Sequence, residues 1–191
     1  MRTCYFSKCF CFATIFYPNQ TLFPFYSDRS GSLPVSYENE VFTLDFPADD
    51  LEEITIPAAL TEIFNNKAKQ CFKGKTDYLL IFENEEEILA AKPNFNNLVK
   101  VECRGVIISS KGNDVDFVSR FFCPAVGVNE DPVTGSAHTT LTSYWAKVCG
   151  KNILTARQVS ARGGNLTVEY LDNRVKISGK GVLYLTGEIY F

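Results

Sequence analysis

One predicted helix carries almost no charge on any side, which limits what can surround it. Apolar residues from Ala137 to Val148 recur at the i, i+4, i+7, i+8, i+11 spacing of a helix face. The opposite side has only small hydroxyl residues, at Thr139, Thr140, Thr142 and Ser143. A helix without a charged face is expected to be enclosed, here by a sheet. Lys147 and Gly150 are the stop signals that end it.

Segments of strand character stand on both sides of that helix in the sequence. Those before it are Phe23–Ser27, Leu33–Tyr37, Val41–Phe46, Tyr78–Phe82, Gly105–Ser110 and Asp116–Phe122. Those after it are Ala156–Ala161, Leu166–Leu171, Arg174–Ser178 and Val182–Tyr190. Two short helices are also expected, one from Pro57 to Asn65 and one from Glu85 to Ala91 that is capped by Asn84. The Asp172-Asn173 pair predicts a tight hairpin turn.

The loop at residues 130–138, Glu-Asp-Pro-Val-Thr-Gly-Ser-Ala-His, sets an acid, a tight turn and a helix start side by side. Asp131 supplies a carboxylate, and Gly135 lets the chain approach a ligand without a Cβ in the way. Ser136 is predicted to be the N-cap of the helix. The free N–H groups of Gly135, Ser136 and Ala137 would then favour a bound carboxylate or phosphate. The other interpretation is an ordinary capped loop, in which Asp131 and Ser136 serve only the backbone.

The run from Glu130 to Trp145 resembles the second signature of the PhzF-like (phenazine biosynthesis) isomerase family. Supporting stretches occur in the family's order. They are Ser30–Leu33, Asp45–Ala48, Arg104–Ile107, Arg120–Phe122, Arg162–Val168 and Ile177–Lys180. The resemblance implies an α+β fold of the diaminopimelate epimerase type, in which a mostly antiparallel sheet curls around a central helix. Two such domains enclose a cleft in the family, and the N-terminus of the central helix faces that cleft.

The first-domain features of the family are absent from this sequence. No Asn-x-Ser-Glu-Thr stretch, which in the family carries the principal acid/base Glu, and no cleft-lining Gly-His pair occurs. The resemblance therefore implies that residues 25–191 form the second domain, whose last strand would complete the first domain. Residues 1–24 form an atypical N-terminal segment, which we expect to result from a truncated or misread coding sequence.

By resemblance, the function is a cofactor-independent proton shift on a small carboxylate-bearing substrate. Matching positions give Asp131 an acid/base role, and the Thr134-Gly135-Ser136 corner would hold the substrate carboxylate, with a hydroxyl hydrogen bond from Ser136. His138 is expected to be a buried structural partner. We expect the truncated chain to be inactive alone. The alternatives are a non-catalytic binding or assembly module and, more remotely, a racemase or epimerase with a cleft between two chains.

Composition narrows the class of protein. A net charge of −3 with scattered basic residues argues against nucleic-acid binding. The apolar run Cys9–Tyr17 is too short to span a bilayer, and it lacks the cleavage site of a signal peptide. The seven cysteines form no C-x-x-C pair and the chain has a single histidine, so free thiols of a cytoplasmic protein are expected rather than a metal site. The expected partners are a small acid, a complementing first domain or a second copy of the chain.

Overall fold

The computed structural model describes residues 19–28 and 31–181, and they form one mixed sheet with helices on it. The strands are β1 (Leu22–Ser27), β2 (Gly31–Glu38), β3 (Val41–Pro47), β4 (Glu52–Ile54), β5 (Gln70–Lys73), β6 (Asp77–Ile81), β7 (Gly105–Lys111), β8 (Phe117–Cys123), β9 (Val128–Asp131), β10 (Ile153–Gln158), β11 (Gly164–Leu171) and β12 (Arg174–Lys180). The helices are α2 (Ala58–Ile63), α3 (Glu85–Ala90), α4 (Phe95–Leu98), the 3₁₀ turn η2 (Pro124–Val126) and α5 (Gly135–Cys149).

The strand order is β1-β2-β3-β12-β11-β10-β8-β7-β6-β5-β4, and β9 pairs with β8 outside this path. Only the β6–β7 and β8–β10 pairs are parallel among the described strands. The predicted α+β fold with a mostly antiparallel sheet is therefore confirmed. The hairpin at Asp172-Asn173 is confirmed too, because Leu171 pairs with Arg174 across a two-residue turn.

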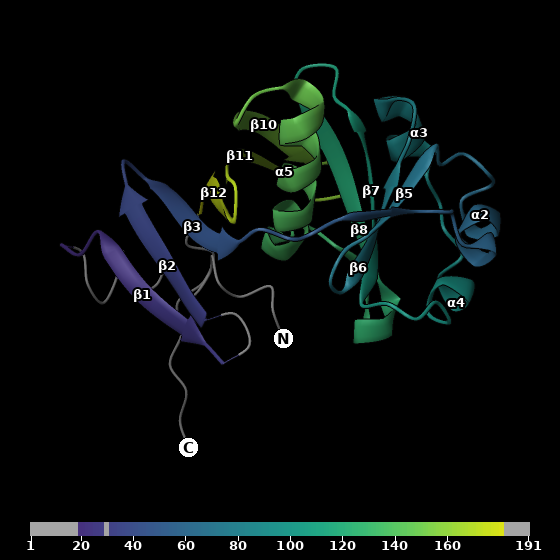
Figure 1. Ribbon diagram of the computed structural model, residues 1–191, viewed down its shortest axis with the longest axis horizontal. Helices are drawn as coiled ribbons and strands as arrows, with labels where there is room; N and C mark the ends of the chain where they lie inside the picture. Colours follow the sequence, from purple (N-terminus) through teal and green to yellow (C-terminus); the bar gives the residue numbers. More distant parts are fainter. Residues whose placement is uncertain (1–18, 29–30, 182–191) are drawn as a thin grey trace.

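Helix α5 is enclosed up to Ala146, as the sequence predicted, whereas Val148 of the predicted apolar face is 57% exposed. Figure 1 shows it lying against β10, β11 and β12, between the β1–β3 strands on one side and β6–β8 on the other. Its hydroxyl groups are satisfied inside the protein: Thr142 donates to the His138 carbonyl at 2.6 Å, and Thr140 donates to an Asp49 carboxylate oxygen at 2.8 Å. The helix ends at Gly150 in the left-handed conformation. No helix within residues 19–28 and 31–181 is long and apolar enough to cross a membrane.

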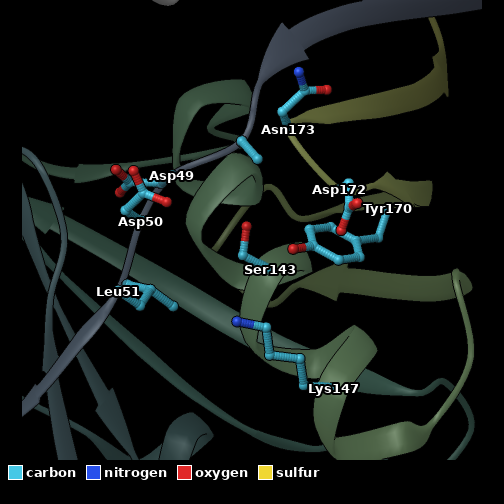
Figure 2. A pocket seen from close by; sticks show the side chains of 9 residues that line it. Asp49, Asp50, Leu51, Ser143, Lys147, Tyr170, Asp172 and Asn173 are labelled. Carbon is cyan, nitrogen blue, oxygen red and sulfur yellow. The ribbon is translucent and has the colours of Figure 1, made fainter.

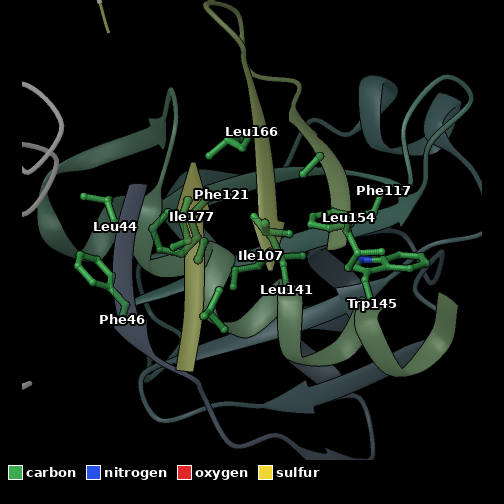
Figure 3. Packing of buried hydrophobic residues seen from close by; sticks show 14 of the residues in the cluster. Leu44, Phe46, Ile107, Phe117, Phe121, Leu141, Trp145, Leu154, Leu166 and Ile177 are labelled. Atoms are coloured by element: carbon green, nitrogen blue, oxygen red, sulfur yellow. The ribbon is translucent and has the colours of Figure 1, made fainter. Parts of the chain in front are cut away.

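Strands β6, β7 and β8 are buried on both faces, so alternate residues enter two different cores. On one face, Ile107 and Phe117 pack in a cluster with Leu141 and Trp145 of α5 (Figure 3). The other face packs in the cluster formed with α2, α3 and α4. Its strand residues are Leu80, Val106, Ile108, Val118 and Phe122. This arrangement fixes α5, and with it the loop that precedes it, against the middle of the sheet.

One predicted strand was wrong in its bounds, and several short elements were not predicted. The strand expected at Ala156–Ala161 is β10, Ile153–Gln158. It ends early because Ser160 leaves the sheet to bond the Pro132 carbonyl at 2.7 Å. The elements without a sequence prediction are β4, β5, β9, α4 and η2. The strand predicted at Val182–Tyr190 lies outside the described residues.

Candidate active site

The 130–138 loop connects β9 to α5. Asp131 is the last residue of β9 and pairs with Phe121 of β8, and α5 begins four residues later at Gly135. The N-cap is Thr134, so the prediction of Ser136 as the cap was wrong. The reason is that Gln158 fixes the Thr134 backbone N–H at 2.8 Å, which starts the helix earlier and leaves Ser136 in its first turn.

Asp131 is a buried carboxyl group with 5% of its surface exposed. Burial raises its pKa above the ordinary range, although a hydrogen bond from Thr134 and the charges of Arg162 and Arg104 act in the opposite direction. The Thr134 hydroxyl donates to Oδ2 at 2.6 Å, and no residue within 19–28 and 31–181 donates to Oδ1. A carboxylate of raised pKa with one uncommitted oxygen is suited to proton transfer.

Gln158 holds the loop from the neighbouring strand β10. Its Nε2 donates to the Asp131 carbonyl at 2.6 Å, and its Oε1 accepts the Thr134 N–H. Gly164 packs so closely that a Cβ there would meet Val133 Cγ2 at 2.4 Å. Gln158 was not predicted to belong to the site. The available signal was that Leu154 and Ala156 supply the first two inward positions of β10 and a glutamine the third.

Arg104 joins the loop to a buried acid at the start of β6. Its guanidinium forms a two-point ion pair with Asp77, which is 1% exposed, through Nε to Oδ1 at 2.8 Å and through Nη2 to Oδ2. The remaining Nη1 donates to Ser136 Oγ at 2.8 Å. Because an arginine only donates, Ser136 accepts this bond and keeps its own hydroxyl proton for another acceptor. Arg104 was noticed in the sequence only as part of a family stretch.

The first amides of α5 lie beside these side chains. In a helix of 15 residues, the N–H groups of Gly135, Ser136 and Ala137 have no carbonyl one turn earlier to bond. The positive end of the helix dipole adds to them, so the position favours an anion. The structure therefore brings Asp131, Thr134, Gly135 and Ser136 together at one helix end. The Thr134 hydroxyl and amide are already used inside the loop.

His138 was expected to be a buried structural residue and the cysteines to be free thiols. His138 is fully buried and its Nδ1 lies 2.7 Å from the Thr134 carbonyl. Burial lowers its pKa to about 4, so it is neutral at physiological pH. Cys71 and Cys123 are buried free thiols, Cys103 is half-buried and Cys149 is exposed, whereas Cys4, Cys9 and Cys11 lie outside the described residues.

A separate hollow of about 380 Å³ lies between the chain that follows β3 and the side of α5. Figure 2 shows Ser143 and Lys147 of α5 facing it, with Asp49 and Asp50 on one side and Tyr170 and Asp172 on the other. None of the residues predicted for the site lines this hollow. It is therefore not the predicted substrate position.

A protein-family model and related sequences both match most of this chain. A family model described as phenazine biosynthesis-like protein, PhzC-PhzF, matches residues 26–187. An uncharacterized isomerase of Pseudomonas aeruginosa is 43% identical over 165 residues, which cover 86% of this chain and 63% of that protein. The chain thus spans less than two thirds of the length of this relative.

Two solved structures share the fold. The crystal structure of an Enterococcus faecalis protein of the PhzF family is 36% identical, with a TM-score of 0.91, and the match covers 97% of this chain and 71% of that one. A predicted epimerase of Pseudomonas aeruginosa is 17% identical with a TM-score of 0.62, over 92% of this chain and 68% of that one. The second likeness concerns the fold alone.

Proposed function

Because the chain belongs to the phenazine biosynthesis-like (PhzC-PhzF) family, we propose that its 130–138 loop is one side of the active site of a cofactor-independent isomerase. The observation that supports this most is the position of Asp131. A buried carboxyl group of raised pKa lies directly before a helix N-terminus that favours an anion. An acid/base group beside a carboxylate-binding position is what a proton shift on a small acid requires.

In the proposed reaction, the substrate carboxylate binds to the N–H groups of Gly135, Ser136 and Ala137 and to the Ser136 hydroxyl. A carboxylate takes a proton from one carbon of the substrate, and a proton is returned to another carbon of the same molecule, so that its formula is unchanged. Asp131 takes part in this transfer through its Oδ1. Thr134 completes the corner by holding Oδ2 at 2.6 Å, which fixes the orientation of the carboxyl group.

We propose that turnover requires a second acid/base group on the opposite side of the substrate. The family resemblance assigns that role to a Glu in an Asn-x-Ser-Glu-Thr stretch, which is not in this sequence. The chain would then bind a small acid alone and isomerise it only with a segment that supplies this Glu, in a cytoplasmic complex. The same observation favours the alternative function, a non-catalytic module that binds a small acid.

Binding and catalysis can be tested separately. The ¹⁵N-labelled chain would be titrated with a panel of 2-amino and 2-hydroxy carboxylic acids, and the amides of Gly135, Ser136 and Ala137 are expected to shift. The same acids would be incubated in D₂O with protein isolated from its native cell, and deuterium on carbon measured by mass spectrometry. Asp131→Asn should keep the shifts and lose the exchange, whereas Asp172→Asn, at an exposed turn, should keep both.

The outcomes separate the proposals. Shifts at these amides with deuterium exchange support the isomerase. Shifts without exchange in the protein from the native cell would support the binding module instead. If no acid of the panel shifts the three amides, the 130–138 loop is not a carboxylate site and both proposals fail.

A further inference from the structure

A second hollow, of about 430 Å³, lies on the β10–β11 connection and is bordered by α3. Arg157 and Arg162 line it, and no acidic side chain does so among the described residues. The hollow beside α5 in Figure 2 differs, because its lining includes Asp49, Asp50 and Asp172. The β10–β11 hollow therefore has an excess of positive charge in a space large enough for a small molecule.

The two guanidinium groups are available to a ligand. Arg157 donates from Nε to Asn165 Oδ1 at 3.0 Å, which orients its planar group, and its two terminal nitrogens donate to no residue within 19–28 and 31–181. Arg162 is exposed and makes no hydrogen bond or ion pair with any other described residue. Two guanidinium groups that form no hydrogen bond or ion pair with a carboxylate of the described residues match a bidentate oxyanion such as a carboxylate or phosphate.

The rest of the lining includes a hydrogen-bonded turn and an exposed apolar side chain. Gly163 adopts the left-handed conformation, with φ of 70°, and its N–H donates to Ser160 Oγ at 3.0 Å. Ser160 in turn donates to the Pro132 carbonyl, so this connection is fastened to the 130–138 loop. Leu89 of α3 borders the hollow with 56% of its surface exposed. An exposed leucine beside two arginines suits a ligand with both an apolar and an anionic part.

We propose that the β10–β11 hollow is a binding site for a small organic oxyanion, held by Arg157 and Arg162 with its apolar part against Leu89. The site is distinct from the carboxylate position at the N-terminus of α5, and the proposal does not depend on isomerase activity. The two positions are electrostatically connected, because the charge of Arg162 acts on Asp131. An oxyanion bound at Arg162 would weaken that influence.

The test is an NMR titration of the ¹⁵N-labelled chain with benzoate at constant ionic strength, with benzyl alcohol as the uncharged probe and inorganic phosphate as the oxyanion without an apolar part. Benzoate is expected to shift the amides of Gly163, Gly164 and Asn165, and benzyl alcohol is not. Arg157→Gln and Arg162→Gln should each weaken benzoate binding about tenfold or more, since a charge-assisted hydrogen bond is lost. The control Lys67→Gln, an exposed charge that follows α2 and does not line the hollow, should leave benzoate binding unchanged.

Two results would overturn the proposal: no benzoate-dependent shift at residues 163–165, or shifts that persist at the same affinity in Arg162→Gln. If phosphate binds as tightly as benzoate, the proposed contact between the ligand and Leu89 is rejected. Unchanged benzoate affinity in a Leu89→Ala variant would reject that contact as well. Shifts confined to Gly135, Ser136 and Ala137 would reject this site and support the α5 site. Shifts confined to residues 163–165 would support this site and reject benzoate binding at the α5 site. Failures of the two proposals are therefore distinguishable.

Discussion

Arg104 Nη1 donates to Ser136 Oγ at 2.8 Å, across a sequence separation of 32 residues. The rest of the guanidinium is paired with Asp77, which lies at the start of β6 and is buried. The Ser136 hydroxyl is consequently set by a charged group that is itself locked in place. We infer that Arg104 is a positioning residue for the ligand at the α5 N-terminus.

The first prediction concerns carboxylate affinity. Ser136→Ala removes one neutral donor and should weaken binding of the acid found by titration about two- to tenfold. Arg104→Lys should weaken it similarly, because a lysine cannot hold Asp77 at two points and also reach Ser136. Isothermal titration calorimetry measures both. The matched control is Arg174→Lys, an arginine that pairs with Asp45 at 2.7 Å and makes no hydrogen bond to the 130–138 loop, and it should leave the affinity unchanged.

The size of the Arg104→Lys effect should depend on Ser136. If Arg104 acts through the Ser136 hydroxyl, the double variant with Ser136→Ala should bind little worse than Ser136→Ala alone. Additive losses in this cycle would show that Arg104 acts on the ligand by another route. A loss shared by Arg174→Lys would indicate general destabilisation rather than positioning.

The second prediction concerns the contact between Gly164 and Val133. An alanine at position 164 would place its Cβ 2.4 Å from Val133 Cγ2, so Gly164→Ala should lower the free energy of unfolding by about 1–3 kcal/mol. Adding Val133→Ala removes the obstructing methyl groups and should recover part of this loss in urea denaturation. A double variant less stable than the sum of its single changes would contradict the steric explanation.

The third prediction concerns the enclosure of α5. Leu141 has no exposed surface, and Leu141→Ala should lower the free energy of unfolding by about 2–5 kcal/mol because it leaves a cavity in the packed core. Val148 lies on the same helix with 57% of its surface exposed, and Val148→Ala should change stability by about 0.5 kcal/mol or less. Urea unfolding of the two variants provides the comparison. Equal losses would mean that α5 is not enclosed by the sheet.

Local patterns allowed much of the fold to be predicted. The uncharged sides of the helix after Ala137 required it to be enclosed, and the Asp172-Asn173 pair specified its hairpin without reference to distant residues. The pairing of β12 with β3 could not be predicted from local patterns. Ser178 lies opposite Thr43, but neither sequence segment contains a signal that specifies the other as its partner strand.

The candidate site was predictable only from residues that are close in the sequence. Asp131, Gly135 and Ser136 were proposed because they are neighbours in one loop. Gln158 was not, because its role depends on contacts with Asp131 and Thr134 across 27 and 24 residues. The Ser136 cap was wrong for the same reason, since the Gln158 amide, a distant group, decides where the helix starts.

The last prediction concerns pH and His138. Its pKa is about 4 in the folded protein because of burial, against about 6.5 in an unfolded chain. Between these values the unfolded chain binds the extra proton, so His138 lowers stability as the pH falls from about 6.5 to about 4 and has no effect above that window. The expected loss is about 3 kcal/mol over the window. His138→Asn keeps a donor for the Thr134 carbonyl and cannot titrate. Protonation of the carboxylates therefore affects both proteins alike and cancels in the difference between their free energies of unfolding. Urea unfolding at several pH values should show the wild type losing its advantage over His138→Asn as the pH falls, and parallel curves would mean that His138 is protonated as readily in the folded protein as in the unfolded chain.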